Sequence, residues 1–168
     1  MGRGGIFLRK ARAKFSDRPT GFIWIEQDRV AASGYPASRR QLEWVSRQGV
    51  NTVLTLTEDS LPDGVTRGLA LSFKHIPMKD HEPPNIEDLE KAAAFVLTEV
   101  RQGRKVLVHC LAGQGRTMCV VAAYLIKDRG MKPEEAMRML RSVRRNAIET
   151  AQVEAIFDYA EQPTGGTP

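Results

Sequence analysis

The sequence predicts an α/β protein with a mostly parallel central sheet of four to five strands and helices on both faces. Short apolar segments rich in β-branched residues alternate along the chain with longer segments of helical spacing. This alternation is typical of sheets whose parallel strands are connected by helices. The 168 residues are enough for one domain with its own core, and 42% hydrophobic residues is an ordinary globular composition.

The first half of the chain carries the signals of four strands and one helix. Residues 21–33 (GFIWIEQDRVAAS) contain two β-type runs around a turn at Gln27 and Asp28. The sequence SRRQ at 38–41 is a capping box, and the helix that it starts is expected to end before Gly49. The apolar segments NTVLTLT and LSFKHIP predict two further strands, with a loop at 58–70 between them.

In the second half, each helix has a recognisable start or stop. Asn85 is an N-cap with acidic residues in the following turn, and its helix is expected to end at Gly103. The apolar strand KVLVHC comes next, followed by a helix over 116–129. Pro133 occupies the first position of another helix, and the last helix starts near Thr150.

The excess positive charge lies in one short segment. The net charge is +5, and the first 15 residues contain five basic residues and no acidic one, whereas the remaining 153 contain 20 of each. We therefore expect a flexible basic arm at 1–19, a neutral folded domain at 20–162 and a flexible tail at 163–168. The arm could contact nucleic acid, an acidic membrane surface or a partner, and its composition also resembles a transit peptide.

The cysteine count and hydropathy narrow the class of protein further. Cys110 and Cys119 are too few for a disulfide framework or a zinc site, and no apolar run approaches the ~18 residues of a membrane span. We expect a cytoplasmic monomer with reduced thiols, no membrane span, no metal and no cofactor.

The segment HCLAGQGRT at 109–117 is the strongest functional signal. It lies between an apolar strand and an apolar helical segment, so a glycine-rich loop is expected there. Such a loop turns several backbone N–H groups inward and, with the N-terminus of the next helix, binds a tetrahedral oxyanion. The same field favours the thiolate of Cys110, and the planar fork of Arg116 can hold two phosphate oxygens. A structural cysteine near a surface arginine is the alternative, but it leaves the paired glycines unexplained.

A phosphate ester also needs a proton donor from a second loop. The segment MKDHEPP at 78–84 offers Asp80, His81 and Glu82, and its two prolines would stiffen it. His81 is expected to face solvent. The alternative is a charge-rich solvated turn without a catalytic role.

Three segments together resemble the protein tyrosine phosphatases, and more narrowly the small, single-domain, atypical dual-specificity phosphatases. They are HCLAGQGRT, the D-x-x-P-P pattern that begins at Asp80, and IET at 148–150. The likeness covers about residues 20–160 and includes Trp24 and the LTE segment at 56–58. It implies the cysteine-phosphatase fold, with Cys110 as nucleophile, Arg116 as phosphate clamp and Asp80 as general acid.

The resemblance also implies supporting roles. Thr117 would hydrogen-bond the sulfur, His109 would hold the loop from below, and Glu149 would face the site and orient the hydrolytic water. Met118 stands where these enzymes usually carry glycine, so the packing of the loop is expected to differ. The substrate phosphate would be bound by the loop residues Leu111, Ala112, Gly113, Gln114, Gly115 and Arg116.

These features predict an enzyme that removes phosphate from phosphotyrosine in proteins, and also from phosphoserine or phosphothreonine, through a cysteinyl-phosphate intermediate. Its partner would be a phosphorylated protein or peptide, with nucleic acid as a lesser alternative through the basic arm. An RNA 5′-triphosphatase, a phosphoinositide phosphatase, a sulfurtransferase and a phosphate-binding pseudophosphatase are the other functions considered. Phosphatases of inositol lipids tend to carry lysines inside this loop, and this chain has Leu111 and Gln114 there instead, which argues against a highly charged substrate.

Overall fold

Each strand of the central sheet is four residues long, and the five lie in the order β1-β2-β5-β3-β4. Only β1 pairs antiparallel with its neighbour, and the other pairings are parallel. The predicted mostly parallel sheet is therefore confirmed. The computed structural model describes residues 16–162, and its strands are β1 Ile23–Glu26, β2 Val30–Ser33, β3 Thr52–Thr55, β4 Ser72–His75 and β5 Val106–His109.

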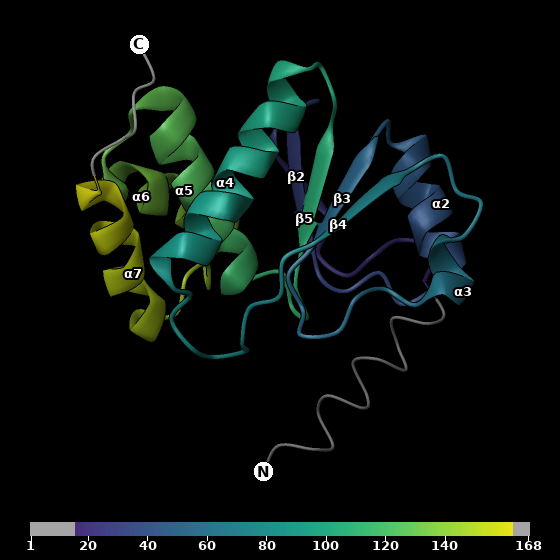
Figure 1. Cartoon of the computed structure of the whole chain (residues 1–168), viewed down its shortest axis with the longest axis horizontal. Coiled ribbons are helices and arrows are strands. Elements are labelled where there is room, and N and C mark those ends of the chain that lie inside the picture. The colour runs from purple at the N-terminus through teal and green to yellow at the C-terminus, as the bar shows by residue number, and fades with distance from the viewer. Residues whose placement is uncertain (1–15, 163–168) are drawn as a thin grey trace.

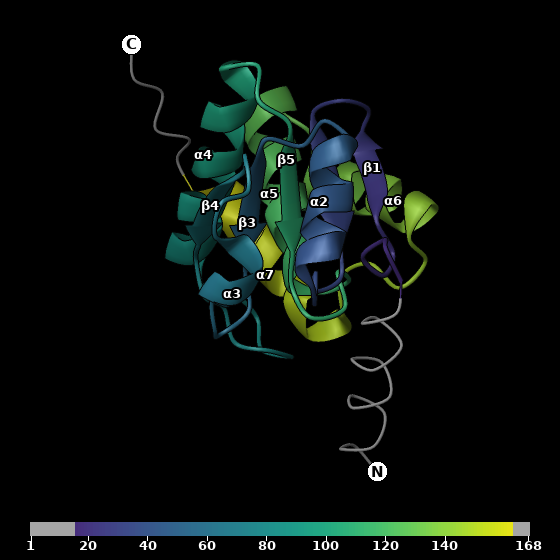
Figure 2. The ribbon, with the colours of Figure 1, turned by 90° about the vertical axis from the view of Figure 1, so that its right-hand side faces the viewer.

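Helices cover both faces of the sheet, as the sequence predicts. Figures 1 and 2 show α4, α5, α6 and α7 on one side, while α2 and the short α3 lie on the other. The helices are α2 Arg39–Arg47, α3 Asp63–Thr66, α4 Ile86–Arg101, α5 Arg116–Arg129, α6 Pro133–Val143 and α7 Thr150–Glu161.

The central strand β5 shows how one apolar run serves both faces. Val106 and Val108 belong to the larger core beneath the four-helix layer, whereas Leu107 belongs to the smaller core beneath α2. All three are fully buried. A strand covered on both faces needs apolar residues at every position, which is why KVLV shows no alternation.

The predicted helix boundaries are confirmed by their caps. The Ser38 side chain accepts a hydrogen bond from the backbone of Gln41, and the Asn85 side chain accepts one from the backbone of Asp88. Pro133 occupies the first position of α6. Gly130 ends α5 with a φ of 62°, a left-handed conformation that glycine adopts without strain.

The described segment begins inside the predicted basic arm (1–19) and ends where the predicted tail (163–168) begins. Residues 1–15 and 163–168 lie outside the described residues. Asp17 forms an ion pair of 2.6 Å with Arg40, and the Ser16 carbonyl accepts a hydrogen bond of 2.9 Å from Gln41. Ser16 and Asp17, which the sequence assigned to the arm, therefore contact α2. Within 16–162, no helix is both long and apolar enough to cross a membrane.

The topology brings three loops together at one edge of the sheet. Because β3, β4 and β5 are parallel, the loops that follow them leave from the same side. The Leu56 amide donates to the His109 carbonyl at 3.0 Å, and the Met78 amide donates to the Leu56 carbonyl at 3.1 Å. The loops containing Cys110 and Asp80 thus meet across the first residues after β3.

Candidate active site

The loop between β5 and α5 wraps closely around the sulfur of Cys110. The cysteine is 2% exposed, and its Sγ accepts a hydrogen bond of 3.2 Å from the amide of Gly113. Helix α5 begins at Arg116, so its N-terminal amides lie at the end of the same loop. An inward amide and a helix N-terminus both stabilise negative charge, on the sulfur or on a bound anion.

Two glycines let the loop turn this tightly. Gly113 has a φ of +69°, and a Cβ there would lie 2.3 Å from the carbonyl oxygen of Ser33. A Cβ at Gly115 would lie 2.8 Å from the side-chain amide of Gln152. Gly113 therefore excludes a side chain both by packing against backbone and by its left-handed conformation, whereas a side chain at Gly115 would have to displace the end of the Gln152 side chain.

Arg116 is almost completely buried, with 1% of its side chain exposed. Its Nη1 donates to the Met78 carbonyl at 2.9 Å, and Nη2 lies 2.7 Å from Oδ1 of Asp80. Its Nε is buried and has no hydrogen-bond partner among residues 16–162. Since buried N–H groups are almost always satisfied, this donor is available to a ligand.

Thr117 differs from its expected arrangement. Its Oγ1 is buried and forms no hydrogen bond within the described part of the chain, so the predicted bond to the Cys110 sulfur is not formed. The sulfur accepts from the Gly113 amide instead. The unpartnered hydroxyl of Thr117 and the unpartnered Nε of Arg116 are neighbours in sequence at the start of α5, next to the loop.

Asp80 is brought to the site as the sequence predicts, and a residue without an assigned role holds it there. Glu58 accepts a hydrogen bond of 3.1 Å from the Asp80 amide and lies 3.2 Å from Nη1 of Arg116. The pKa of Glu58 is lowered, first by a hydrogen bond from its own backbone and then by those of Asp80 and Arg116. Glu58 therefore ties the general-acid candidate to the phosphate clamp.

His109 supports the loop from beneath, where the resemblance placed it. It is fully buried, with Nε2 at 2.8 Å from Oγ1 of Thr55 and Nδ1 at 3.4 Å from the Cys110 carbonyl. Because the carbonyl can only accept, Nδ1 carries the proton and the Thr55 hydroxyl donates to Nε2. Burial lowers the pKa of His109 to about 4, so the imidazole is neutral.

Glu149 and His81 meet at the mouth of the site. His81 is largely exposed, as expected, and its Nδ1 lies 3.3 Å from Glu149 while its Nε2 lies 3.7 Å from Asp80. Its pKa is raised, first by the hydrogen bond to Glu149 and then by the charges of both acids. Glu149 thus reaches the acid loop through His81, from its position at the N-cap of α7.

The other residues of the loop are partly exposed, whereas the first residues of α5 that follow it are buried. Leu111, Ala112 and Gln114 are partly exposed along the loop. Met118 and Cys119 are fully buried in the larger core, and burial raises the pKa of Cys119 to about 12. The core accommodates Met118 where a glycine was expected, and Cys119 is a protonated core residue.

Sequence reasoning missed three residues that contact this site. They are Glu58, Gln152 and Arg144, whose guanidinium donates to the carbonyl oxygens of Ala112 and Gly113. Glu58 belongs to the LTE segment at 56–58, so the resemblance noted for this segment could have identified it as a site residue. Gln152 stands three residues after the N-cap Glu149, and its side chain accepts from the Glu149 amide at 3.1 Å.

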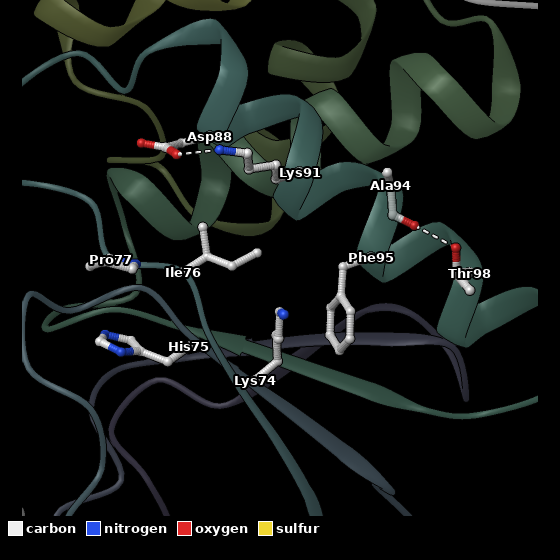
Figure 3. Close-up of a pocket in the computed structure, with 9 residues that line it drawn as sticks. All are labelled: Lys74, His75, Ile76, Pro77, Asp88, Lys91, Ala94, Phe95 and Thr98. Carbon is white, nitrogen blue, oxygen red and sulfur yellow. Dashed lines mark hydrogen bonds and ion pairs between the residues drawn. The ribbon is translucent and has the colours of Figure 1, made fainter.

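A separate groove of about 550 Å³ lies between the edge strand β4 and helix α4 (Figure 3). Ile76, Ala94 and Phe95 form apolar parts of its wall, and Lys74 extends into it. No residue of the 110–116 loop lines this groove. It is therefore distinct from the cysteine site.

The fold and the cysteine loop together are those of the protein tyrosine phosphatases. A family model described as "Swiss Army Knife protein, DSP-PTPase phosphatase domain" matches residues 19–157. The chain therefore belongs to this family of dual-specificity-type phosphatase domains, and the resemblance inferred from the sequence is confirmed.

The proteins that this chain resembles in sequence include lipid and protein phosphatases. The chain is 30% identical over 145 residues to PTPMT1 of Arabidopsis thaliana, a phosphatidylglycerophosphate phosphatase, over 85% of this chain and 42% of that protein. PTPMT2 of the same plant is 30% identical, over 83% of this chain and 64% of that protein. The human phosphatidylglycerophosphatase and protein-tyrosine phosphatase 1 is 35% identical over 48% of this chain and 41% of its own length. This chain thus spans about half the length of these relatives.

Solved structures share the fold. Tk-PTP in its active form superposes with a TM-score of 0.76 at 33% identity, over 84% of this chain and 97% of Tk-PTP. PTPMT1 in complex with PI(5)P gives a TM-score of 0.72 at 24% identity, over 83% and 94% of the two chains. The second likeness shows the fold alone.

Proposed function

We propose that this chain hydrolyses phosphate monoesters through a cysteinyl-phosphate intermediate. The observation that carries the proposal is a set of unsatisfied donors beside one thiol. Arg116 Nε and Thr117 Oγ1 are buried without partners among residues 16–162, next to the loop that holds Cys110. A phosphate group would satisfy these donors and place its phosphorus in reach of the sulfur.

In the first step, the Cys110 thiolate attacks phosphorus while the bond from phosphorus to the ester oxygen breaks. The leaving oxygen takes a proton from Asp80, which enters as the carboxylic acid and leaves as the carboxylate. Arg116 and the inward amides hold the negative charge of the transferring group. Asp80 is within reach of the leaving oxygen, because its carboxyl group lies 2.7 Å from the arginine that would hold the phosphate.

In the second step, water attacks the cysteinyl phosphate. The Asp80 carboxylate accepts a proton from the water, the bond between sulfur and phosphorus breaks, and the thiolate is restored as inorganic phosphate leaves. Glu149 lies at the mouth, linked through His81 to the acid loop. We propose it as a group that orients this water.

For the substrate, we propose phosphotyrosine in proteins, with phosphoserine and phosphothreonine as further substrates. The loop presents Leu111 and Gln114 and no lysine, which suits a single phosphate on an uncharged aryl group. A phospholipid monoester is the second candidate. It is favoured by the names of the Arabidopsis relatives, which match across more than four fifths of this chain.

The test is one enzyme preparation assayed on four substrates: a phosphotyrosine peptide, phosphatidylglycerophosphate in vesicles, phosphatidylinositol 5-phosphate in vesicles and a 5′-triphosphorylated RNA. We expect kcat/KM to be highest for the peptide. Cys110→Ser is the matched control and should abolish phosphate release while the protein still binds the peptide, because attack needs the thiolate. A higher kcat/KM for either lipid would move the assignment to the lipid phosphatases. Turnover by the serine variant would overturn the mechanism.

A further inference from the structure

An arginine outside the predicted motifs contacts the back of the loop. Arg144 follows the last residue of α6, and its own amide donates to the Leu140 carbonyl at 2.8 Å. Its Nη1 donates to the Gly113 carbonyl at 2.6 Å and to the Ala112 carbonyl at 3.3 Å. Its Nη2 contacts the carbonyl of Gly21, on the segment that leads into β1.

These contacts control the direction in which the loop amides point. A peptide group is planar, and its C=O and N–H point in opposite directions. Holding the Ala112 carbonyl outward therefore turns the Gly113 N–H inward, and this N–H donates to the Cys110 sulfur at 3.2 Å. Holding the Gly113 carbonyl outward in the same way turns the N–H of Gln114 inward.

The chemistry of the side chain suits this task. A guanidinium carries five N–H donors in a rigid fork, so one side chain can bind several carbonyls at fixed angles. The half-buried guanidinium also places a positive charge on the outer side of the loop. Gly21 has a φ of +62°, and a Cβ there would lie 3.0 Å from Nη2, so its lack of a side chain leaves room for the fork.

We propose that Arg144 is a positioning residue that sets the anion-binding geometry of the loop. It acts through the carbonyls of Ala112 and Gly113, while Arg116 provides the direct clamp. Without Arg144, the two peptide groups lose their outward partners and can rotate, which would remove inward N–H groups from both the sulfur and the phosphate. The inference rests on the proposed phosphatase function, but its main measurements need no turnover.

The neighbouring residue gives a matched control. Arg145 is the same residue type one position further on, is exposed, and forms no hydrogen bond or ion pair with residues 16–162. The variants are therefore Arg144→Met, Arg144→Lys and Arg145→Met. The lysine variant keeps the charge and replaces the fork by a single ammonium, which makes it the milder change.

The first measurement is binding of inorganic phosphate by titration calorimetry. The second is the ratio of the inactivation rates with iodoacetate and iodoacetamide at one pH. Both reagents alkylate the thiolate, but only iodoacetate is an anion that the loop amides attract. Measured at a temperature where each variant is folded, the ratio therefore reports the anion-binding geometry and is independent of the total protein concentration.

We expect Arg144→Met to weaken phosphate binding by about tenfold or more, the effect of losing hydrogen bonds to a charged group. The iodoacetate-to-iodoacetamide ratio should fall toward the value of a free thiol such as glutathione, and Arg144→Lys should lie between it and the wild type. Arg145→Met should match the wild type in both measurements. If Arg144→Met does not fold, the same two measurements on Arg144→Lys, compared with the wild type, decide whether Arg144 positions the loop.

A folded Arg144 variant with unchanged phosphate affinity and an unchanged ratio would overturn the proposal. A loss of thermal stability with an unchanged ratio would make Arg144 a structural residue only, which also overturns it. The wild type could bind phosphate and be alkylated selectively but hydrolyse none of the four substrates. The proposed phosphatase function would then be wrong, while the phosphate affinities and alkylation ratios would still decide the role of Arg144.

Discussion

Lowering the pH from 7 to 5 is expected to destabilise the protein through the buried side chain of His109. Burial lowers the pKa of His109 to about 4 in the folded state, whereas in the unfolded chain it titrates near 6.5. Between these values the unfolded state binds more protons, so stability decreases as the pH falls below about 6.5. The linkage relation gives a loss of about 2 kcal/mol between pH 7 and pH 5 from this residue.

The assay is urea unfolding of the wild type and of His109→Gln at both pH values, followed by tryptophan fluorescence. The variant should be less stable at pH 7, because glutamine fits the contacts with Thr55 and Cys110 less well. Its loss of stability between pH 7 and pH 5 should be smaller than that of the wild type by about 2 kcal/mol.

A second histidine provides the control, because its pKa shifts in the opposite direction. The pKa of His81 is raised by Glu149 and Asp80, so its contribution is present below about pH 6.5 and is lost as the pH rises through its folded pKa. Removing it in His81→Gln should not reduce the loss in acid. If His109→Gln loses as much stability between pH 7 and pH 5 as the wild type, the imidazole is not held neutral and the reasoning fails.

Three further perturbations test the site. Gly113→Ala should lose phosphate binding and unfold at lower urea concentration, because its Cβ would lie 2.3 Å from the Ser33 carbonyl; phosphate affinity equal to that of the wild type would contradict this loop geometry. Asp80→Asn should slow hydrolysis of phosphotyrosine by about 10² to 10⁴ and have a smaller effect on aryl phosphates with acidic phenols; a steep leaving-group dependence in Glu82→Gln instead would move the acid to that residue. EDTA should leave the rate unchanged, because the nucleophile and the charge-stabilising groups are all protein groups; activity lost to EDTA and restored by a divalent cation would contradict this.

The loop and its frame could be predicted because their signals are local. A strand, a glycine-rich turn and a helix follow each other within 109–129, so spacing alone places Cys110 and Arg116 at the two ends of one loop. Asp80 required a second loop to reach the same place. The parallel register of β3, β4 and β5 brings it there, and the D-x-x-P-P pattern pointed to it.

The groups that hold these residues in place could not be predicted in the same way. Glu58 and the carbonyls of Leu56 and Met78 contact Arg116 only because two loops cross at the edge of the sheet. Arg144 is 31 residues from the Gly113 carbonyl that it binds, and nothing in the sequence distinguishes it from Arg145. Backbone carbonyls have no residue signature, so contacts to them become visible only in the folded chain.

The burial of helix α5 has a consequence for how this protein can change during evolution. Every residue from Arg116 to Ile126 is buried, so this helix has no solvent-facing side on which substitutions would be tolerated. The acid loop, in contrast, exposes His81 and Glu82. In a library of random variants, we expect neutral and specificity-changing substitutions to accumulate in that loop, while 116–126 stays nearly invariant. New substrate preferences would then arise from the surrounding loops, on an unchanged catalytic helix.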